Sequence, residues 1–367
     1  MLYIRILYVS AAIIAGLLFF SCSSGSSGPS GPDINPPYLI QPVNGLKTSS
    51  QTPFFIFKHT NAGIEGVYYD FALSDSYSFS NTVYYLSGIV PASDRYRVDI
   101  GISLNPGKEY FYRTTARKVE DDDSAVSNIY SIYIENVGAN TPNLYMCAGD
   151  SITDSGFTGM DYSDFLQDYL QPYFGESART VNEGIPGLYA WELKGLIEMF
   201  LYFNRPAYTT ILIGINDLRH PGSCPEPFNC ETVQEIVDTA YYCKWYGSIP
   251  VVCTLIPAVG YTGTLYDAQI RQFNSELYEA CLFHQIDIVD LYDAFSDYDG
   301  NIEELFADDI HPNISGNQLI ASAIFDYLSN RTINSSATLW SEDSPVKNRR
   351  IEPGRKGKIS SPIISLD

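Results

Sequence analysis

Residues 144–153, with the sequence LYMCAGDSIT, decide the fold of the longer part of the chain. The run from Leu144 to Ala148 is short, apolar and uncharged, as is typical of a strand in a parallel sheet covered on both faces. Gly149 ends the run, and because glycine adopts backbone angles closed to other residues, a sharp turn there can project the next side chains. Open α/β sheets bind ligands at the carboxyl ends of their strands. The pattern presents Ser151 at that edge, either as a nucleophile or as a serine in an ordinary strand-to-helix turn.

Strand and helix patterns alternate through residues 141–335, which we expect to form one α/β domain. This alternation predicts a parallel sheet with helices on both faces. Two helix starts have the pattern of a capping box, Thr232 with Glu235 and Thr264 with Asp267. The predicted strands are 144–148, 179–182, 209–213, 250–255 and 286–290, and the predicted helices are 162–173, 190–202, 232–246, 267–284 and 315–328.

The first 21 residues have the layout of an export signal, with Arg5 before an apolar stretch that is too short and poorly flanked for a spanning helix. Together with Cys22, which follows directly, they resemble a bacterial lipoprotein signal. The resemblance implies that Cys22 is lipidated and that the exported protein is anchored to a bacterial membrane, at its periplasmic face or at the cell surface. Simple secretion with a free or paired thiol is the alternative. Residues 22–37, rich in Ser, Gly and Pro, are expected to form a flexible tether.

Residues 38–137 have strand chemistry throughout. Short β-branched or aromatic runs are separated by Gly, Pro, Asn, Asp and Ser, a pattern that predicts an all-β sandwich. Residues 104–110, LNPGKEY, resemble the tyrosine corner of fibronectin type III domains, in which the hydroxyl of the tyrosine, here Tyr110, bonds to the upstream backbone. The predicted strands are 54–58, 67–72, 82–86, 95–100, 110–116 and 130–135.

The formal net charge of −21 argues against nucleic acid as a partner, because proteins that bind the phosphate backbone need a basic surface. Residues 336–367 are basic and lack apolar periodicity. They are expected to form a disordered tail, either simply solvated or touching anionic lipid or glycan.

The seven cysteines have no metal-binding spacing, so we expect neither a metal nor a cofactor. Cys224 and Cys230 flank a short loop, and in an exported protein they are candidates for a disulfide. Four others lie in predicted strands or helices and are expected to be buried thiols, with a bond between the last two left open: Cys147, Cys253, Cys243 and Cys281.

His311 is the histidine best placed to accept a proton from Ser151. Asp308 lies three residues before it, and this spacing lets both side chains project from one short turn. The carboxylate can then hold the tautomer of the imidazole and stabilise its positive charge. Pro312 is expected to stiffen the exit from the turn.

Two further turns follow predicted strands on the same rim, and they can supply donors for a developing negative charge. The side-chain amide of Asn216 and the backbone amides of Gly187 and Ser151 together can form an oxyanion hole. Gly184 is a second candidate for the glycine position.

The blocks Gly149-Asp150-Ser151, Gly187, Gly214-Ile215-Asn216-Asp217 and Asp308-Asp309-Ile310-His311-Pro312 resemble, in order, the four motif blocks of the SGNH (GDSL) hydrolase superfamily. The resemblance implies a flavodoxin-like, three-layer domain with a five-stranded parallel sheet. It also implies that Ser151 is the nucleophile, Gly187 and Asn216 are oxyanion donors, His311 is the base and Asp308 orients it. Asp150, Gly184 and Asp217 are candidates for supporting roles. Leu188 departs from the pattern, since relatives often have an acidic residue there.

These features predict an exported serine esterase that forms an acyl-enzyme. The expected substrates are short-acyl esters, such as acetyl groups, on a carbohydrate. A lipid esterase or lysophospholipase is the alternative within the enzyme class, and a non-catalytic surface binding lipoprotein is the alternative outside it. The sequence makes no prediction of the oligomeric state.

Overall fold

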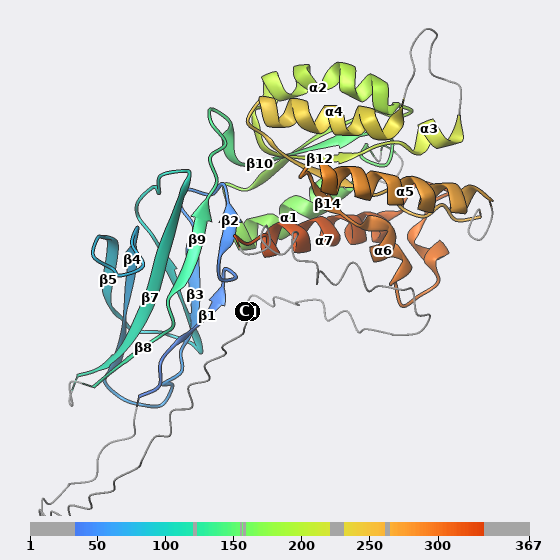
Figure 1. Cartoon of the computed structure of the whole chain (residues 1–367). Helices are drawn as coiled ribbons and strands as arrows, with labels where there is room; N and C mark the ends of the chain where they lie inside the picture. The colour runs from blue at the N-terminus through green and yellow to red at the C-terminus, as the bar shows by residue number, and fades with distance from the viewer. Residues whose placement is uncertain are drawn as a thin grey trace, which may run out of the picture. The chain divides into compact units, whose positions relative to one another are not determined.

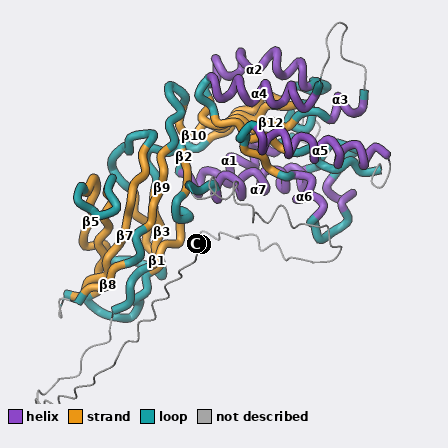
Figure 2. The backbone as a smooth tube through the Cα atoms, viewed as in Figure 1, coloured by secondary structure: helices purple, strands orange, loops and turns teal. Residues whose placement is uncertain are grey.

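The computed structural model describes residues 34–119, 123–154, 156, 159–220, 231–260 and 265–333. Strands alone occupy the first hundred of these residues, and helices alternate with strands in the remainder (Figures 1 and 2). The predictions for the signal, Cys22 and most of the tether, for the 336–367 tail and for the Cys224–Cys230 disulfide lie outside the described residues. No helix in the described ranges combines the length and apolar character needed to cross a membrane.

The strands of the first part form two sheets. One is antiparallel in the order β1-β3-β6, and the other has the order β2-β9-β7-β4-β5 with β8 beside β7. Pairing in the second sheet is antiparallel except that β2 runs parallel to β9. The bounds are β1 Tyr38–Gln41, β2 Leu46–Thr48, β3 Phe54–Lys58, β4 Val67–Ser74, β5 Thr82–Ile89, β6 Arg95–Asp99, β7 Lys108–Lys118, β8 Ser124–Val126 and β9 Tyr130–Ile134.

Aromatic rings from both sheets form the core of this part. Phe55 in β3 lies 5.0 Å from Phe71 in β4 and 4.4 Å from Tyr112 in β7, measured between ring centroids. Along β7 every second side chain is buried, as expected for a strand with one face on a core. Tyr110 bonds to the backbone as predicted, since its hydroxyl accepts a hydrogen bond from the Asn105 N–H at 3.0 Å. These contacts favour the sandwich, while the relation to fibronectin type III stays a prediction.

The second part contains the predicted parallel sheet, with five strands in the order β11-β10-β12-β13-β14. This order is that of flavodoxin-like folds. Helices α1 and α7 pack on each other, and α2, α4 and α5 form a row in which neighbours are in contact. The strand bounds are β10 Thr141–Gly149, β11 Arg179–Gly184, β12 Pro206–Leu212, β13 Ile249–Cys253 and β14 Asp287–Val289. The main helix bounds are α1 Tyr162–Phe174, α2 Ala190–Asn204, α4 Thr232–Trp245, α5 Leu265–Phe283 and α7 Ile314–Asn330.

In the second part three short elements were not predicted, α3 (Ile215–Arg219), α6 (Leu291–Ser296) and the 3-10 turn η1 (Ile302–Leu305), and in the first part the short strands β1, β2 and β8 were not predicted either. The capping box at Thr232 was wrong, because Glu231 is the N-cap residue of α4 and the Thr232 hydroxyl donates to Asp217 at 3.3 Å instead. Thr264 lies outside the described residues. The four cysteines expected to be buried thiols, Cys147, Cys243, Cys253 and Cys281, are buried and free, so the bond left open between Cys243 and Cys281 is not formed.

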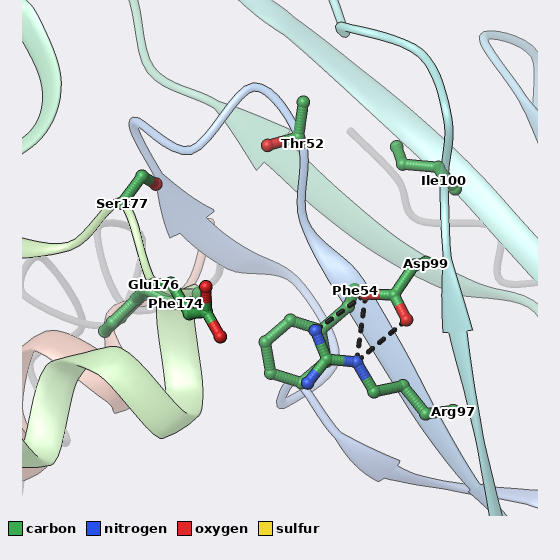
Figure 3. Close-up of a pocket in the computed structure, with 9 residues that line it drawn as sticks. Thr52, Phe54, Arg97, Asp99, Ile100, Phe174, Glu176 and Ser177 are labelled. Atoms are coloured by element: carbon green, nitrogen blue, oxygen red, sulfur yellow. Dashed lines mark hydrogen bonds and ion pairs between the residues drawn. The ribbon is translucent and has the colours of Figure 1, made fainter.

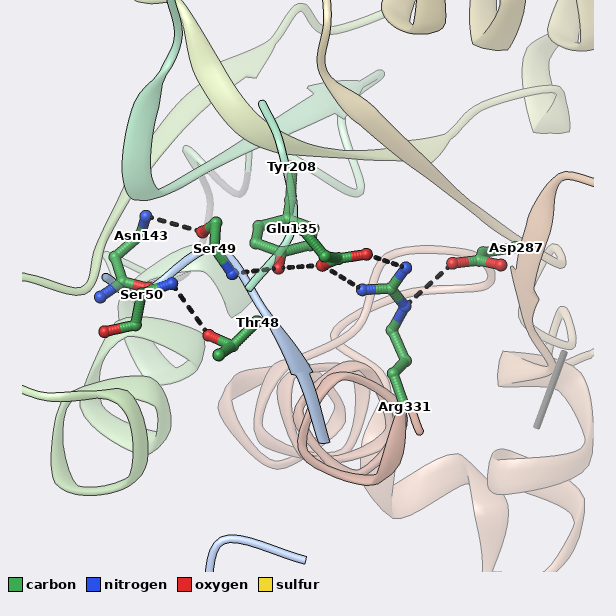
Figure 4. Close-up of polar contacts among 8 residues, drawn as sticks. All are labelled: Thr48, Ser49, Ser50, Glu135, Asn143, Tyr208, Asp287 and Arg331. Carbon is green, nitrogen blue, oxygen red and sulfur yellow. Dashed lines mark hydrogen bonds and ion pairs between the residues drawn. The ribbon is translucent and has the colours of Figure 1, made fainter. Parts of the chain in front are cut away.

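An ion pair joins the two parts of the chain (Figure 4). Arg331, directly after α7, donates to both carboxylate oxygens of Glu135, directly after β9, at 2.9 and 3.0 Å. Its Nε donates to Asp287 at 2.9 Å. Arg331 and Glu135 expose only 9% and 10% of their side chains, so both charges depend on each other for stabilisation.

Hydrogen bonds extend this network toward the start of β10. The Tyr208 hydroxyl donates to Glu135 at 2.5 Å and accepts from the Ser49 N–H at 2.9 Å. Ser49 Oγ in turn accepts from the Asn143 N–H at 3.0 Å. The network therefore connects the loop after β2, the end of β9 and the parallel sheet.

A cavity of about 440 Å³ lies between β3, β6 and the turn after α1 (Figure 3). The Arg97 guanidinium lies 3.7 Å above the Phe54 ring and donates to the Asp99 carboxylate at 2.6 to 3.0 Å. Glu176 and Ser177 line the opposite side. The cation of this cavity is thus already paired, and none of the predicted catalytic residues lines it.

Candidate active site

Ser151 lies in a tight turn directly after β10. The carbonyl of Asp150 accepts hydrogen bonds from the N–H groups of Thr153 and Asp154 at 3.1 and 3.0 Å, and its side chain accepts from Ile152 N–H at 2.9 Å. Asp150 therefore caps a single helical turn that begins at Ser151. A side chain on Gly149 would overlap the Leu212 carbonyl oxygen, so glycine is required there for the turn to lie close to β12.

The structure brings Ser151 together with His311, which lies 160 residues later in the chain, and with Asp308, three residues before His311. Ser151 Oγ lies 2.8 Å from His311 Nε2, and His311 Nδ1 lies 2.7 Å from Asp308 Oδ2. Both distances are those of good hydrogen bonds. The three side chains form one continuous proton-transfer chain of the kind that activates a serine hydroxyl.

Asp308 holds the short loop that presents His311. Its Oδ1 accepts from the N–H groups of Ile310 and His311 at 2.9 and 2.8 Å. Partial burial raises the pKa of Asp308, but these bonds and the contact with the imidazole outweigh burial, and the pKa lies below its ordinary value. The carboxylate is thus charged at neutral pH and orients the imidazole through Oδ2.

The three groups predicted as oxyanion donors each keep a hydrogen that no described residue accepts. The N–H groups of Ser151 and Gly187 have no acceptor among the described residues. Gly187 has φ +81°, a left-handed backbone angle that favours glycine. The Asn216 side chain, 7% exposed, donates one amide hydrogen to the Leu188 carbonyl at 3.0 Å and retains a second for a substrate.

The side chain of Asp217 links the segment that contains Asn216 to the segment that follows Gly187. Its carboxylate accepts from the N–H of Ala190, the first residue of α2, at 3.1 Å, and from the Thr232 hydroxyl at 3.3 Å. Burial raises its pKa to about 6 despite the bond from Ala190. This carboxylate therefore accepts one of the backbone N–H groups at the start of α2.

Asp150 is the most deeply buried carboxyl group beside Ser151, with 1% of its surface exposed. Burial raises its pKa to about 7, and the nearby charge of Asp217 acts in the same direction. Its Oδ2 has no hydrogen-bond partner within the described part of the chain. The group therefore gains and loses its proton close to neutral pH.

Gly184 acts beneath the nucleophile turn rather than as an oxyanion donor. Its N–H donates to Asn182 Oδ1 at 2.8 Å, and a side chain there would overlap the backbone of Asp154. Asn182 was not predicted as a site residue; its amide donates to the Thr153 carbonyl and to Asp161, both at 2.8 Å. The sequence signal that could have identified Asn182 is its place at the end of a predicted strand, at the edge of the sheet where Ser151 lies.

The comparisons with known proteins concern this second part. Residues 147–319 match the model of the GDSL-like Lipase/Acylhydrolase family. A comparison with curated proteins found no significant match.

Several solved structures are similar. An α/β hydrolase from the metagenome of Lake Arreo, Spain, is 22% identical over 53% of this chain and 99% of its own, with a TM-score of 0.46. The acetylxylan esterase Axe2 from Geobacillus stearothermophilus is 22% identical over 52% of this chain and 96% of its own, with a TM-score of 0.45. A GDSL-like lipase from Bacteroides thetaiotaomicron is 16% identical over 51% and 87%, with a TM-score of 0.40. The family match supports the placement of residues 147–319 among the SGNH (GDSL) hydrolases.

Proposed function

We propose that the protein is a serine esterase that cleaves esters through an acyl-enzyme. The observation that carries the proposal is the unbroken chain from Ser151 Oγ through the imidazole of His311 to Asp308, with links of 2.8 and 2.7 Å. The match of residues 147–319 to a lipase and acylhydrolase family supports ester hydrolysis.

In this mechanism Ser151 Oγ attacks the ester carbonyl carbon while its proton passes to His311 Nε2. The negative charge on the carbonyl oxygen is stabilised by the N–H groups of Ser151 and Gly187 and by the free amide hydrogen of Asn216. The tetrahedral intermediate collapses, the ester C–O bond breaks, and the imidazolium gives its proton to the leaving alkoxide. Water, deprotonated by the same imidazole, then attacks the acyl-enzyme and releases the carboxylate product and Ser151.

The substrate class we propose is a short-acyl, acetyl-type ester on a carbohydrate. Export, anchoring through Cys22 and an accompanying β domain, all expected from the sequence, favour a glycan outside the cytoplasm. The net charge of −21 disfavours a strongly anionic substrate.

A lipid esterase is the second candidate, because apolar side chains are exposed around the candidate site. Ile185 lies between Gly184 and Gly187 and is 36% exposed, and Ile314 follows the His311 loop and is 48% exposed. Such side chains can contact the acyl chain of a longer ester. The exposure of Ile185 and Ile314 gives no support to the alternative of a protein that binds a partner without catalysis.

The test is the hydrolysis of p-nitrophenyl acetate, butyrate and decanoate by a protein that begins at Asp33. Ser151→Ala should reduce kcat about 10⁶-fold, because the nucleophile is lost, whereas Ser315→Ala, which removes an exposed hydroxyl near the same rim, should leave it unchanged. Activity that falls beyond acetate indicates the short-acyl enzyme, and activity that rises with chain length indicates the lipid esterase. Equal turnover by Ser151→Ala would overturn the mechanism.

A further inference from the structure

Large apolar side chains are exposed at the carboxyl ends of three neighbouring helices, α2, α4 and α5. Figure 1 shows α2 and α4 side by side, and α4 also contacts α5. Trp245 is 88% exposed, Phe283 81% and Phe203 75%. We call this surface the aromatic edge; its members are Met199, Tyr202, Phe203, Tyr241, Tyr242, Trp245, Leu282 and Phe283.

The helix ends are held at one edge of the sheet, where β10 begins. The Arg205 carbonyl, after α2, accepts from the Thr141 N–H at 2.8 Å. The Tyr246 carbonyl, after α4, accepts from the Asn140 amide at 2.9 Å. Tyr241 in α4 joins α5 through a 2.9 Å bond between its hydroxyl and His284. The aromatic edge is therefore remote from Ser151, which follows the opposite end of β10.

The exposed area is large for a soluble surface. Whole aromatic side chains present about 150–250 Å² each, so Tyr202, Phe203, Trp245 and Phe283 at 61–88% exposure present on the order of 600 Å². Contiguous apolar patches of this size on a monomer usually mark an interaction site.

The charge of this surface differs from that of the whole chain. Acidic residues outnumber basic ones by 43 to 22 overall, yet the last turns of α2, α4 and α5 contain no acidic residue. Arg205 follows α2 directly, and Lys244 lies in the last turn of α4, where its Nζ also donates to the carbonyls of His284 and Gln285 at 3.2 and 2.9 Å. The nearest carboxylates on α2 and α5, Glu198 and Glu279, lie a turn before the helix ends. Aromatic rings with cations beside them suit an interface between hydrocarbon and phosphate groups.

We propose that the aromatic edge docks on a phospholipid surface, with the rings among the acyl chains and the cations near the phosphates. This contact does not depend on the esterase activity or on acylation of Cys22. A second copy of this chain fits less well, because a two-fold contact would bring the cations of one edge against those of the other. In the docked state the catalytic rim faces away from the bilayer.

The experiment uses the protein that begins at Asp33 and vesicles of phosphatidylcholine with a minority of phosphatidylglycerol. We expect co-sedimentation with the vesicles and a blue shift of the Trp245 emission, which brominated phosphatidylcholine quenches. Trp245→Phe should still bind but lose that signal. Replacing Phe203, Trp245 and Phe283 together by Ser should weaken partitioning by about tenfold or more.

The matched control is Tyr77→Ser, which removes an aromatic ring that is 65% exposed in the first part of the chain and should leave vesicle binding unchanged. Absence of vesicle binding and of quenching in the unaltered protein would overturn the proposal. So would dimerisation in solution that the triple variant abolishes, since that result assigns the surface to a second copy. Trp245→Phe assigns the quenching to Trp245, because the chain also has Trp191 and Trp340, and this measurement is unaffected if the triple variant fails to fold.

Discussion

Two carboxylates in this molecule pair with basic side chains at similar hydrogen-bond lengths but in opposite surroundings. Asp308 and His311 are 2.7 Å apart and expose 54% and 17% of their side chains, whereas Glu135 and Arg331 are 2.9 Å apart and expose 10% and 9%. The first pair is open enough to exchange protons with water. The second is sealed between the two parts of the chain, where neither charge can be solvated alone. The comparison indicates that burial, and not distance, separates a pair suited to move protons from a pair suited to hold the fold.

Replacing the exposed carboxylate should have the largest effect of the changes within these pairs. In Asp308→Asn the amide cannot hold the imidazole in the tautomer that accepts from Ser151, so kcat should fall about 10³- to 10⁴-fold. Steady-state ester hydrolysis measures this change, with Asp309→Asn as the neighbouring control. If both variants kept full activity, Asp308 would not be the orienting acid. Thermal stability should change little, because the carboxylate is half exposed.

Breaking the buried pair of Glu135 and Arg331 should have the opposite result, in which stability falls and the activity of the folded protein is kept. Arg331→Met leaves the Glu135 carboxylate buried with only the Tyr208 hydroxyl and should destabilise the protein by about 3–5 kcal/mol, while kcat of the folded fraction stays unchanged. Unfolding in urea gives the first quantity and ester hydrolysis below the transition gives the second.

The matched variant removes both charges. Adding Glu135→Leu to Arg331→Met should restore much of the stability, because the most buried carboxylate left without a cation is then also removed and only the partly exposed Asp287 remains unpaired. A single variant that unfolds at the same urea concentration as the unaltered protein would show that this pair does not hold the two parts together.

The difference between the pairs also explains what the sequence could predict. Asp308 and His311 lie three residues apart beside a strand-and-helix pattern, and the parallel sheet that brings Ser151 to them follows from short apolar runs. Glu135 and Arg331 are separated by 196 positions, and nothing in their local sequence marks them as partners. Asn182 and the role of Asp217 at α2 were missed for the same reason, since each acts on the backbone of a distant segment. Periodicity predicts elements, whereas polar contacts between elements depend on the finished packing.

Asn216, as an oxyanion donor, contributes to catalysis through a contact that belongs to neither of these two pairs. Asn216→Ala removes one of the three donors and should cost about 3 kcal/mol of transition-state stabilisation, a fall in kcat of about 10²-fold or more. KM should change little, because the charge forms after binding. Asn313→Ala and Asn301→Ala are unsuitable controls, because these side chains cap α7 and η1, so Asn128→Ala, at an exposed position in the first part of the chain, serves instead. Full activity in Asn216→Ala would remove this residue from the oxyanion hole.

The smallest effect we predict concerns a buried carboxyl group that has no cation beside it in the described structure. Asp150 has a pKa raised by burial from 3.8 to about 7, so between these values the folded state binds a proton that the unfolded state has released. Stability from this group is therefore present at low pH and is lost as the pH rises toward 7. In Asp150→Asn the amide keeps the acceptor for Ile152 but cannot ionise, so this loss disappears.

The measurement is the free energy of unfolding in urea at about pH 5 and about pH 6.5. Over this interval the unaltered protein should lose about 2 kcal/mol more than Asp150→Asn, since one pKa unit corresponds to about 1.4 kcal/mol. Asp217 contributes a loss of the same sign to both proteins, so the difference between them reports on the ionisation of Asp150, including its repulsion by Asp217. If the free energy of unfolding changed with pH by the same amount in both proteins, Asp150 would be ionised in the folded state. A group other than the described cations would then stabilise this charge beside Ser151.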